Sequence, residues 1–164
     1  MSARPKILGV IPARLGSTRL PGKVLREIAG KPMLYWVYHH SRRSPLLADL
    51  LVATENEEVK QFCETQGIPV TLTAQHPSPT DRVHEVMTRM DAEVYVNIQG
   101  DEPMLRPAHF ELLLTPFLQL ASIQTAASHL SSPMAESSKM VPTFTENLRR
   151  GWWVEHCQVW YLGS

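Results

Sequence analysis

Residues 7–23 read ILGVIPARLGSTRLPGK, a short apolar run followed by a loop rich in glycine and basic residues. The run from Ile7 to Ile11 is apolar and largely β-branched, as expected of a strand buried on both faces. Gly16 and Gly22 allow the loop backbone to turn tightly or to approach a ligand closely. In open α/β sheets, ligands bind in the loops beyond the carboxyl ends of the strands. The stretch therefore predicts the first strand of an α/β sheet and a ligand-binding loop after it.

The chain after this stretch alternates between strand-like and helix-like patterns. Three further apolar runs of strand length lie at residues 50–53, 70–72 and 94–98. Apolar residues at helical spacing fall within residues 34–41, 83–90 and 110–117. Strands separated by helices predict a doubly wound, mostly parallel sheet. We expect this α/β domain to span residues 1–121. Residues 122–164 lack a strand–helix unit that would continue it, so we expect them to form a separate tail.

The composition excludes several classes of partner and location. Lys+Arg and Asp+Glu are equal at 16 each, so no global field recruits nucleic acid or an anionic membrane. No segment approaches the roughly 20 apolar residues that a membrane-spanning helix needs, and the first apolar run is too short for a signal peptide. Cys63 shares an apolar stripe with Val59 and Phe62, as a buried thiol would. We expect a cytoplasmic protein.

The loop after the first strand carries Arg14, Arg19 and Lys23 together with the hydroxyl of Ser17. Arginine forks onto phosphate oxygens, and lysine supplies a compact charge. The spacing is not that of a Walker A loop, because five residues separate the glycines and Val24 follows the lysine. A solvated basic loop is the alternative. The combination of strand, glycines and cations favours a triphosphate site.

The turn after the run at 94–98 reads Gln99-Gly100-Asp101-Glu102-Pro103. It falls at the same edge of the predicted sheet as the basic loop. Mg²⁺ in proteins is often held by one or two carboxylates together with substrate phosphates. Asp101 is therefore the predicted metal ligand. The alternative is a turn in which Asp101 caps the helix that begins near Pro107.

Two other groups of residues are less specific. Ser78 and Arg82 lie just before an amphipathic stretch, where either Thr80 or Asp81 could cap the helix and Arg82 could contact a base or a phosphate. These two alternatives stay open. The seven histidines have no spacing suited to zinc, and the pair at 39–40 is expected on a polar helix face.

Five motifs together resemble the family of 3-deoxy-manno-octulosonate (KDO) cytidylyltransferases. They are IPARLGSTRLPGK, GKPM at 30–33, VAT at 52–54, HPSPTDRVHEV at 76–86 and VNIQGDEP at 96–103. The first is shared with related sugar nucleotidylyltransferases, whereas the TDR segment with GDEP is more specific. The resemblance covers about residues 7–117 and implies a Rossmann-like nucleotidyltransferase fold.

The resemblance also implies a reaction and the residues for it. KDO attacks the α-phosphorus of CTP, which gives CMP-KDO and pyrophosphate for lipopolysaccharide synthesis and requires Mg²⁺. Catalysis would be positioning and charge neutralisation by Arg14, Lys23 and Asp101. By position, the residues near the triphosphate would be Arg14, Ser17, Arg19 and Lys23. Those near the cytidine would be Pro12, Ala13, Ser78 and Arg82, and Asp101 would bind the metal.

The chain departs from the family pattern in two places. Pro79 stands where the family has glycine, which removes an N–H. No family sugar-binding residues, dimerisation region or second metal-binding Asp appear after about residue 121, so we expect a sheet truncated on that side, an unpaired edge and little activity in this chain alone. The alternatives are a non-catalytic nucleotide-binding module and a sibling cytidylyltransferase for another sugar.

Overall fold

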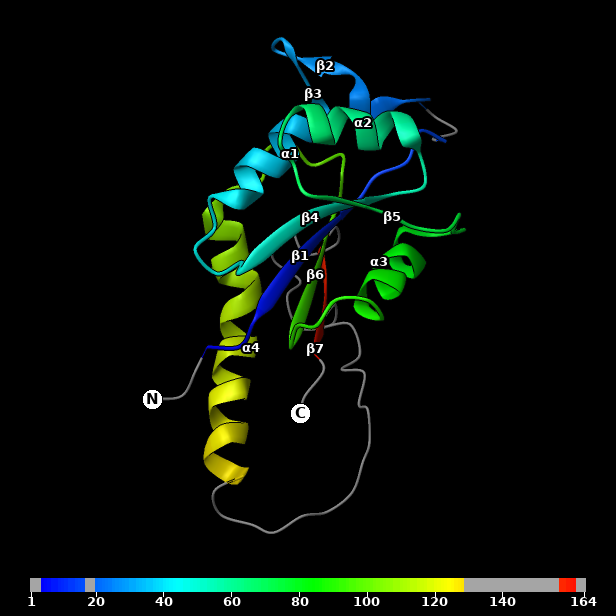
Figure 1. Ribbon diagram of the computed structural model, residues 1–164. Coiled ribbons are helices and arrows are strands. Elements are labelled where there is room, and N and C mark those ends of the chain that lie inside the picture. The colour runs from blue at the N-terminus through cyan, green and yellow to red at the C-terminus, as the bar shows by residue number, and fades with distance from the viewer. Residues whose placement is uncertain (1–3, 17–19, 129–156, 162–164) are drawn as a thin grey trace.

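A computed structural model describes residues 4–16, 20–128 and 157–161 (Figure 1). Its main sheet has five strands in the order β5-β4-β1-β6-β7. Their bounds are Ile7–Pro12 for β1, Asp49–Thr54 for β4, Val70–Leu72 for β5, Val94–Ile98 for β6 and Cys157–Tyr161 for β7. A separate hairpin consists of β2, Glu27–Ile28, and β3, Lys31–Pro32. The four strand runs predicted from the sequence all form strands of the main sheet.

Strand β1 lies at the centre of the parallel part of the sheet. It pairs in parallel with β4 on one side and with β6 on the other, and β4 pairs in parallel with β5. All six residues of β1 are buried. The prediction of a doubly wound, mostly parallel α/β sheet is confirmed. Because four strands run the same way, their carboxyl ends meet at one edge of the sheet.

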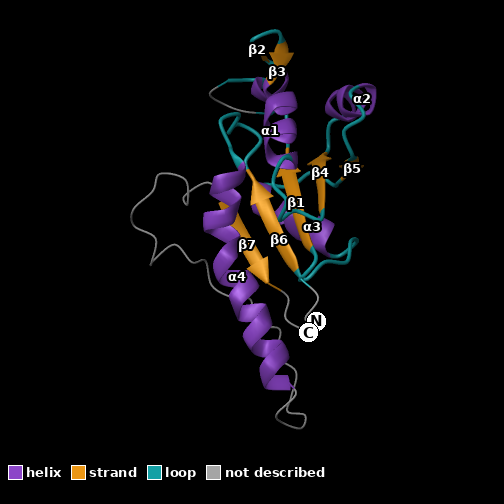
Figure 2. Cartoon of the chain, turned by 90° about the vertical axis from the view of Figure 1, so that its left-hand side faces the viewer, coloured by secondary structure: helices purple, strands orange, loops and turns teal. Residues whose placement is uncertain are grey.

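The helices cover both faces of the sheet. Their bounds are Met33–Arg42 for α1, Glu57–Thr65 for α2, Pro79–Met87 for α3 and Pro107–Ser128 for α4. One core cluster joins alternate strand residues to apolar residues of α1, α2 and α4, and a second joins the intervening strand residues to α3. Figures 1 and 2 show α3 and α4 on opposite sides of the strands. In the described part of the chain, no helix is both long and apolar enough to cross a membrane.

The last described strand changes the expected edge of the sheet. β7 pairs antiparallel with β6, from Cys157 opposite Ile98 to Tyr161 opposite Val94. Residues from the predicted tail thus supply a strand there, so β6 is paired on both sides and β7 forms the edge on that side of the sheet. Helix α4 also runs without interruption past residue 121, the predicted boundary. Most of residues 122–164 lie outside the described residues, so their separation from the domain stays a prediction.

Candidate functional site

Loops from three strands meet at the carboxyl edge of the sheet. The amide of Ala13, just after β1, donates to the carbonyl of Ala53 in β4 at 2.9 Å. Two residues further along the loop, the amide of Leu15 donates to the side-chain oxygen of Asn56 at 2.9 Å. These bonds fix the start of the basic loop against the end of β4. They make the backbone after β1 a defined platform before any ligand binds.

The turn after β6 lies directly against the end of β1. Gly100 is buried, and a Cβ added there would lie only 3.0 Å from the carbonyl oxygen of Pro12. A larger residue would therefore crowd the end of β1, and glycine allows this close packing. The approach places the next residue, Asp101, beside the basic loop, where its carboxylate forms an ion pair with the ammonium group of Lys23. The two side chains remain 32% and 36% exposed, so solutes can reach both.

Local backbone geometry holds Lys23 in this position. Gly22 has φ 66° and ψ 18°, a left-handed conformation that favours glycine. Its amide donates to the carbonyl of Leu15 at 2.9 Å and so closes the loop. Lys23 then begins a short 3₁₀ turn, Lys23–Leu25, whose residue Val24 is buried in the core. The lysine is thus held from both sides while its ammonium group stays accessible.

A second charged pair lies at the same edge, and the sequence did not reveal it. Arg82 of α3 is only 1% exposed and forms an ion pair with Glu55, the residue after β4. Its guanidinium also donates to the hydroxyl of Thr73, just after β5, at 2.8 Å. Burial, followed by the positive charge of Arg14, lowers the pKa of Arg82 from its usual value. The position of Glu55 directly after a buried strand could have marked it as a candidate site residue. Nothing in the sequence indicated that its partner is Arg82.

The start of α3 settles which residue caps that helix. Ser78 is the cap, because its hydroxyl accepts from the amide of Asp81 at 3.1 Å and donates to the Asp81 carboxylate at 2.6 Å. The expectation that Thr80 or Asp81 provides the cap is wrong. Pro79 occupies the first helical turn, where a missing N–H costs nothing. The family's glycine is thus replaced by a residue that suits this position.

The predicted site residues fall into three groups. Pro12 and Ala13 are buried at the end of β1, and Arg14 is exposed beside them. Lys23 and Asp101 contact each other, and the role of the Asp101 carboxylate as a metal ligand stays a prediction. Arg82 and Ser78 lie on α3 and at its cap, and contact Glu55 and Asp81 instead of each other. Ser17 and Arg19 lie outside the described residues.

The Asp101 carboxylate is the candidate metal ligand at this site. Within residues 4–16, 20–128 and 157–161, no group of three or more His, Cys, Asp or Glu side chains could hold a metal ion. A single carboxylate still fits Mg²⁺, since that ion commonly takes most of its other ligands from waters and substrate phosphates. The Asp101 carboxylate already interacts with a cation, because it pairs with the ammonium group of Lys23. The residues therefore fit a metal that arrives with a phosphate ligand.

Comparison with known families assigns the class of this protein. The profile of a family described as Cytidylyltransferase matches residues 8–150, which is most of the chain. The chain therefore belongs to the cytidylyltransferase family. The match contains the basic loop, the Arg82 segment and the Asp101 turn, and it continues beyond residue 121.

Individual relatives narrow the similarity within that family. The chain is 60% identical over 114 residues to the 3-deoxy-manno-octulosonate cytidylyltransferase of Acidobacterium capsulatum, covering 69% of this chain and 46% of the relative. It is 42% identical over 146 residues to the enzyme of that name from Nitratidesulfovibrio vulgaris, covering 86% and 58%. The chain is thus a KDO cytidylyltransferase homologue, and it spans about half the length of the curated relatives it matches.

A solved structure supports the same grouping. CMP-KDO synthetase complexed with CTP is similar with a TM-score of 0.67 and 45% identity, over 68% of this chain and 47% of that one. The 4-diphosphocytidyl-2C-methyl-D-erythritol synthase of Anaerococcus prevotii is similar with a TM-score of 0.52 at 17% identity, over 71% of this chain and 51% of that one. The second likeness concerns the fold alone. Both comparisons agree with the nucleotidyltransferase fold expected from the sequence.

Proposed function

We propose that this chain binds CTP at the carboxyl edge of its sheet for the transfer of CMP to KDO, with release of pyrophosphate. The observation that carries the proposal is the contact between Lys23 and Asp101, which joins the phosphate-binding and metal-binding candidates in one accessible place. The named relatives and the CTP complex of a similar structure support the choice of nucleotide and sugar. The product serves lipopolysaccharide synthesis in the cytoplasm.

The basic loop supplies the charge that a triphosphate needs. Arg14 is exposed just after β1, at the start of the basic loop, and Lys23 lies at the end of the same loop. On binding, the phosphates of CTP take the place of Asp101 as the anionic partner of Lys23. Charge-assisted hydrogen bonds of this kind are about twice as strong as neutral ones. Ser17 and Arg19 belong to the same proposed set, together with Pro12 and Ala13 near the cytidine.

The Arg82 cluster has a supporting part in this proposal. Its guanidinium already contacts Glu55 and Thr73, so it joins the ends of β4 and β5 to α3. Ser78, at the cap of that helix, and Arg82 border the proposed cytidine subsite. A fixed site of this kind lowers the reaction barrier by holding the reactants in place.

Asp101 is the proposed ligand for Mg²⁺. An ion held there would neutralise part of the triphosphate charge and so help the sugar hydroxyl approach the α-phosphorus. With its carboxylate holding the metal, Asp101 would release the ammonium of Lys23 to the phosphates. The proposal thus gives both residues of the ion pair a new partner in the same step.

An assay of pyrophosphate release tests the proposal. The purified chain is incubated with CTP, Mg²⁺ and, separately, KDO and other acidic sugars. Release that depends on KDO supports the proposed reaction, and release with a different sugar supports a sibling cytidylyltransferase. CTP binding without release under any condition supports a non-catalytic nucleotide-binding module. Absence of CTP binding contradicts the proposal altogether.

A further inference from the structure

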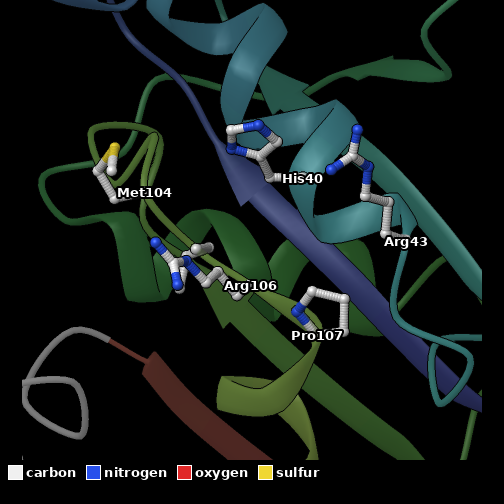
Figure 3. A pocket seen from close by; sticks show the side chains of 6 residues that line it. His40, Arg43, Met104, Arg106 and Pro107 are labelled. Atoms are coloured by element: carbon white, nitrogen blue, oxygen red, sulfur yellow. The ribbon is translucent and has the colours of Figure 1, made fainter.

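A cavity of about 350 Å³ lies outside the proposed CTP site (Figure 3). Its six lining residues are His40, Arg43, Met104, Leu105, Arg106 and Pro107. The first two come from the end of α1, and the other four form the segment that leads into α4. None of the residues assigned to CTP lines it. Its volume is at the lower end of the range for small-molecule sites.

The cavity is positively charged on both sides. None of its six lining residues is acidic, and neither Arg43 nor Arg106 forms an ion pair among the described residues. Burial, and then the charges of His40, Arg43 and Lys31, lower the pKa of the neighbouring His39.

Helix stability explains one of these arginines but not the other. Arg43 follows the last residue of α1, where a positive charge interacts favourably with the helix dipole. Arg106 precedes the first residue of α4, where the dipole is itself positive and a cation is unfavourable. An anion between the two would satisfy Arg106 and the start of α4 together. Arg106, like Arg43, is exposed, so its guanidinium is accessible to such an anion.

The segment that carries Arg106 is held in place before any ligand binds. The ring of His40 donates from Nδ1 to the carbonyl oxygen of Pro103 at 2.6 Å, which leaves Nε2 for other contacts. Leu105 is 4% exposed and anchored in the core, and the Arg106 amide donates to the ring of His109 at 3.1 Å. The cavity wall is therefore preorganised, which reduces the entropy lost on binding.

We propose that this cavity binds a small organic dianion, with phosphate or paired carboxylate groups, between Arg43 and Arg106. Both groups are doubly charged oxyanions that arginine binds through paired N–H donors. Met104 and Pro107 provide an apolar wall for the carbon part of the ligand, and Met104 is 61% exposed. The site is independent of the proposed reaction.

Residue-resolved NMR titration of the whole chain with inorganic phosphate and, separately, succinate tests this proposal. We expect saturable shifts of the amides of Arg43, Leu105 and Arg106, with dissociation constants in the roughly millimolar range. Arg43→Gln and Arg106→Gln should each weaken this binding about tenfold. Saturation by one probe alone identifies its class of group, and saturation by both identifies a general dianion site. Phosphate bound at the basic loop gives shifts at different residues.

Arg42→Gln is the matched control, because Arg42 is exposed on the same helix and does not line the cavity. It should leave the binding nearly unchanged. Absence of saturable shifts with both probes, or equal weakening by Arg42→Gln, overturns the proposal. Thermal unfolding gives a second readout. Arg106→Gln should raise the midpoint without anion and abolish the stabilisation by phosphate, and a lower midpoint with that stabilisation retained overturns the proposal as well.

Discussion

Lys23 and Asp101 lie 78 residues apart in the sequence and form an ion pair at the carboxyl edge of the sheet. The contact joins the loop after the central strand to the turn after its neighbour. Lys23 carries a positive charge, like the metal ion proposed for Asp101. Asp101 carries a negative charge, like the phosphates proposed for Lys23. Under the proposed function, the free protein keeps the proposed cation and anion sites mutually neutralised, and binding of CTP with Mg²⁺ would exchange both partners.

The first prediction concerns Lys23. Lys23→Ala should weaken the binding of CTP with Mg²⁺ about tenfold or more, because hydrogen bonds to charged groups contribute roughly 1.5–3 kcal/mol each. Titration calorimetry measures the affinity. Lys6→Ala is the control, since Lys6 lies at the other end of β1 and contacts Asp49. Equal affinity of the Lys23 variant and the parent would remove Lys23 from the site.

The second prediction separates the two roles of Asp101. Asp101→Asn should abolish the dependence of CTP binding on Mg²⁺, because a neutral amide is a poorer ligand for a hard cation. Without Mg²⁺, the variant should bind CTP at least as tightly as the parent, since Lys23 no longer has a competing carboxylate. Calorimetry with and without Mg²⁺ measures both effects, and Asp91→Asn is an exposed control. If Mg²⁺ strengthens binding equally in parent and variant, Asp101 is only a turn residue.

The third prediction concerns the buried pair of Arg82 and Glu55. Glu55→Gln should lower the free energy of unfolding by about 3 kcal/mol, because it leaves a buried guanidinium without its counter-charge. Glu57→Gln is the matched control. Glu57 pairs with Lys60 at the surface and is 57% exposed, so its loss should cost less than about 1 kcal/mol. Urea unfolding measures both, and similar values for the two variants would contradict a structural role for Glu55.

The fourth prediction concerns Cys63. Burial raises the pKa of its thiol to about 12, so the group stays protonated and unreactive near pH 8. In the unfolded chain its pKa returns toward 9.0 and alkylation becomes faster. Iodoacetamide labelling followed by peptide mass spectrometry should modify Cys63 only when denaturant is present. Rapid labelling of Cys63 in the native protein would show that helix α2 is not packed as described.

The strands and the start of α4 could be predicted because their signals are local. Ile7 to Ile11 and, apart from Asn97, the run at 94–98 are mainly apolar, as expected of parallel strands buried on both faces. Pro107 begins α4 as its position suggested. The cap of α3 was also readable, because Ser78 followed by proline is a favourable helix start. The expectation placed the cap two or three residues too late.

The parts that could not be predicted depend on contacts between distant residues. The pairing of Arg82 with Glu55 and Thr73 requires the ends of β4, β5 and α3 to meet, and no spacing rule encodes that meeting. The strand β7 was missed although Val159, Trp160 and Tyr161 are residue types that favour strands, because no strand–helix pattern precedes it and its pairing is with the distant β6. By contrast, the contact of Lys23 with Asp101 follows from the parallel sheet, since both residues come soon after strands whose carboxyl ends share one edge.

Hydrogen–deuterium exchange with CTP and Mg²⁺ tests most directly whether this edge of the sheet is the nucleotide site. The ligand should protect peptides that contain residues 12–23 and 99–102, where Lys23 and Asp101 lie. A peptide covering residues 88–93, at the opposite edge of the sheet, should exchange at an unchanged rate. Protection confined to that opposite edge, or the absence of any protection at saturating CTP, would contradict the account.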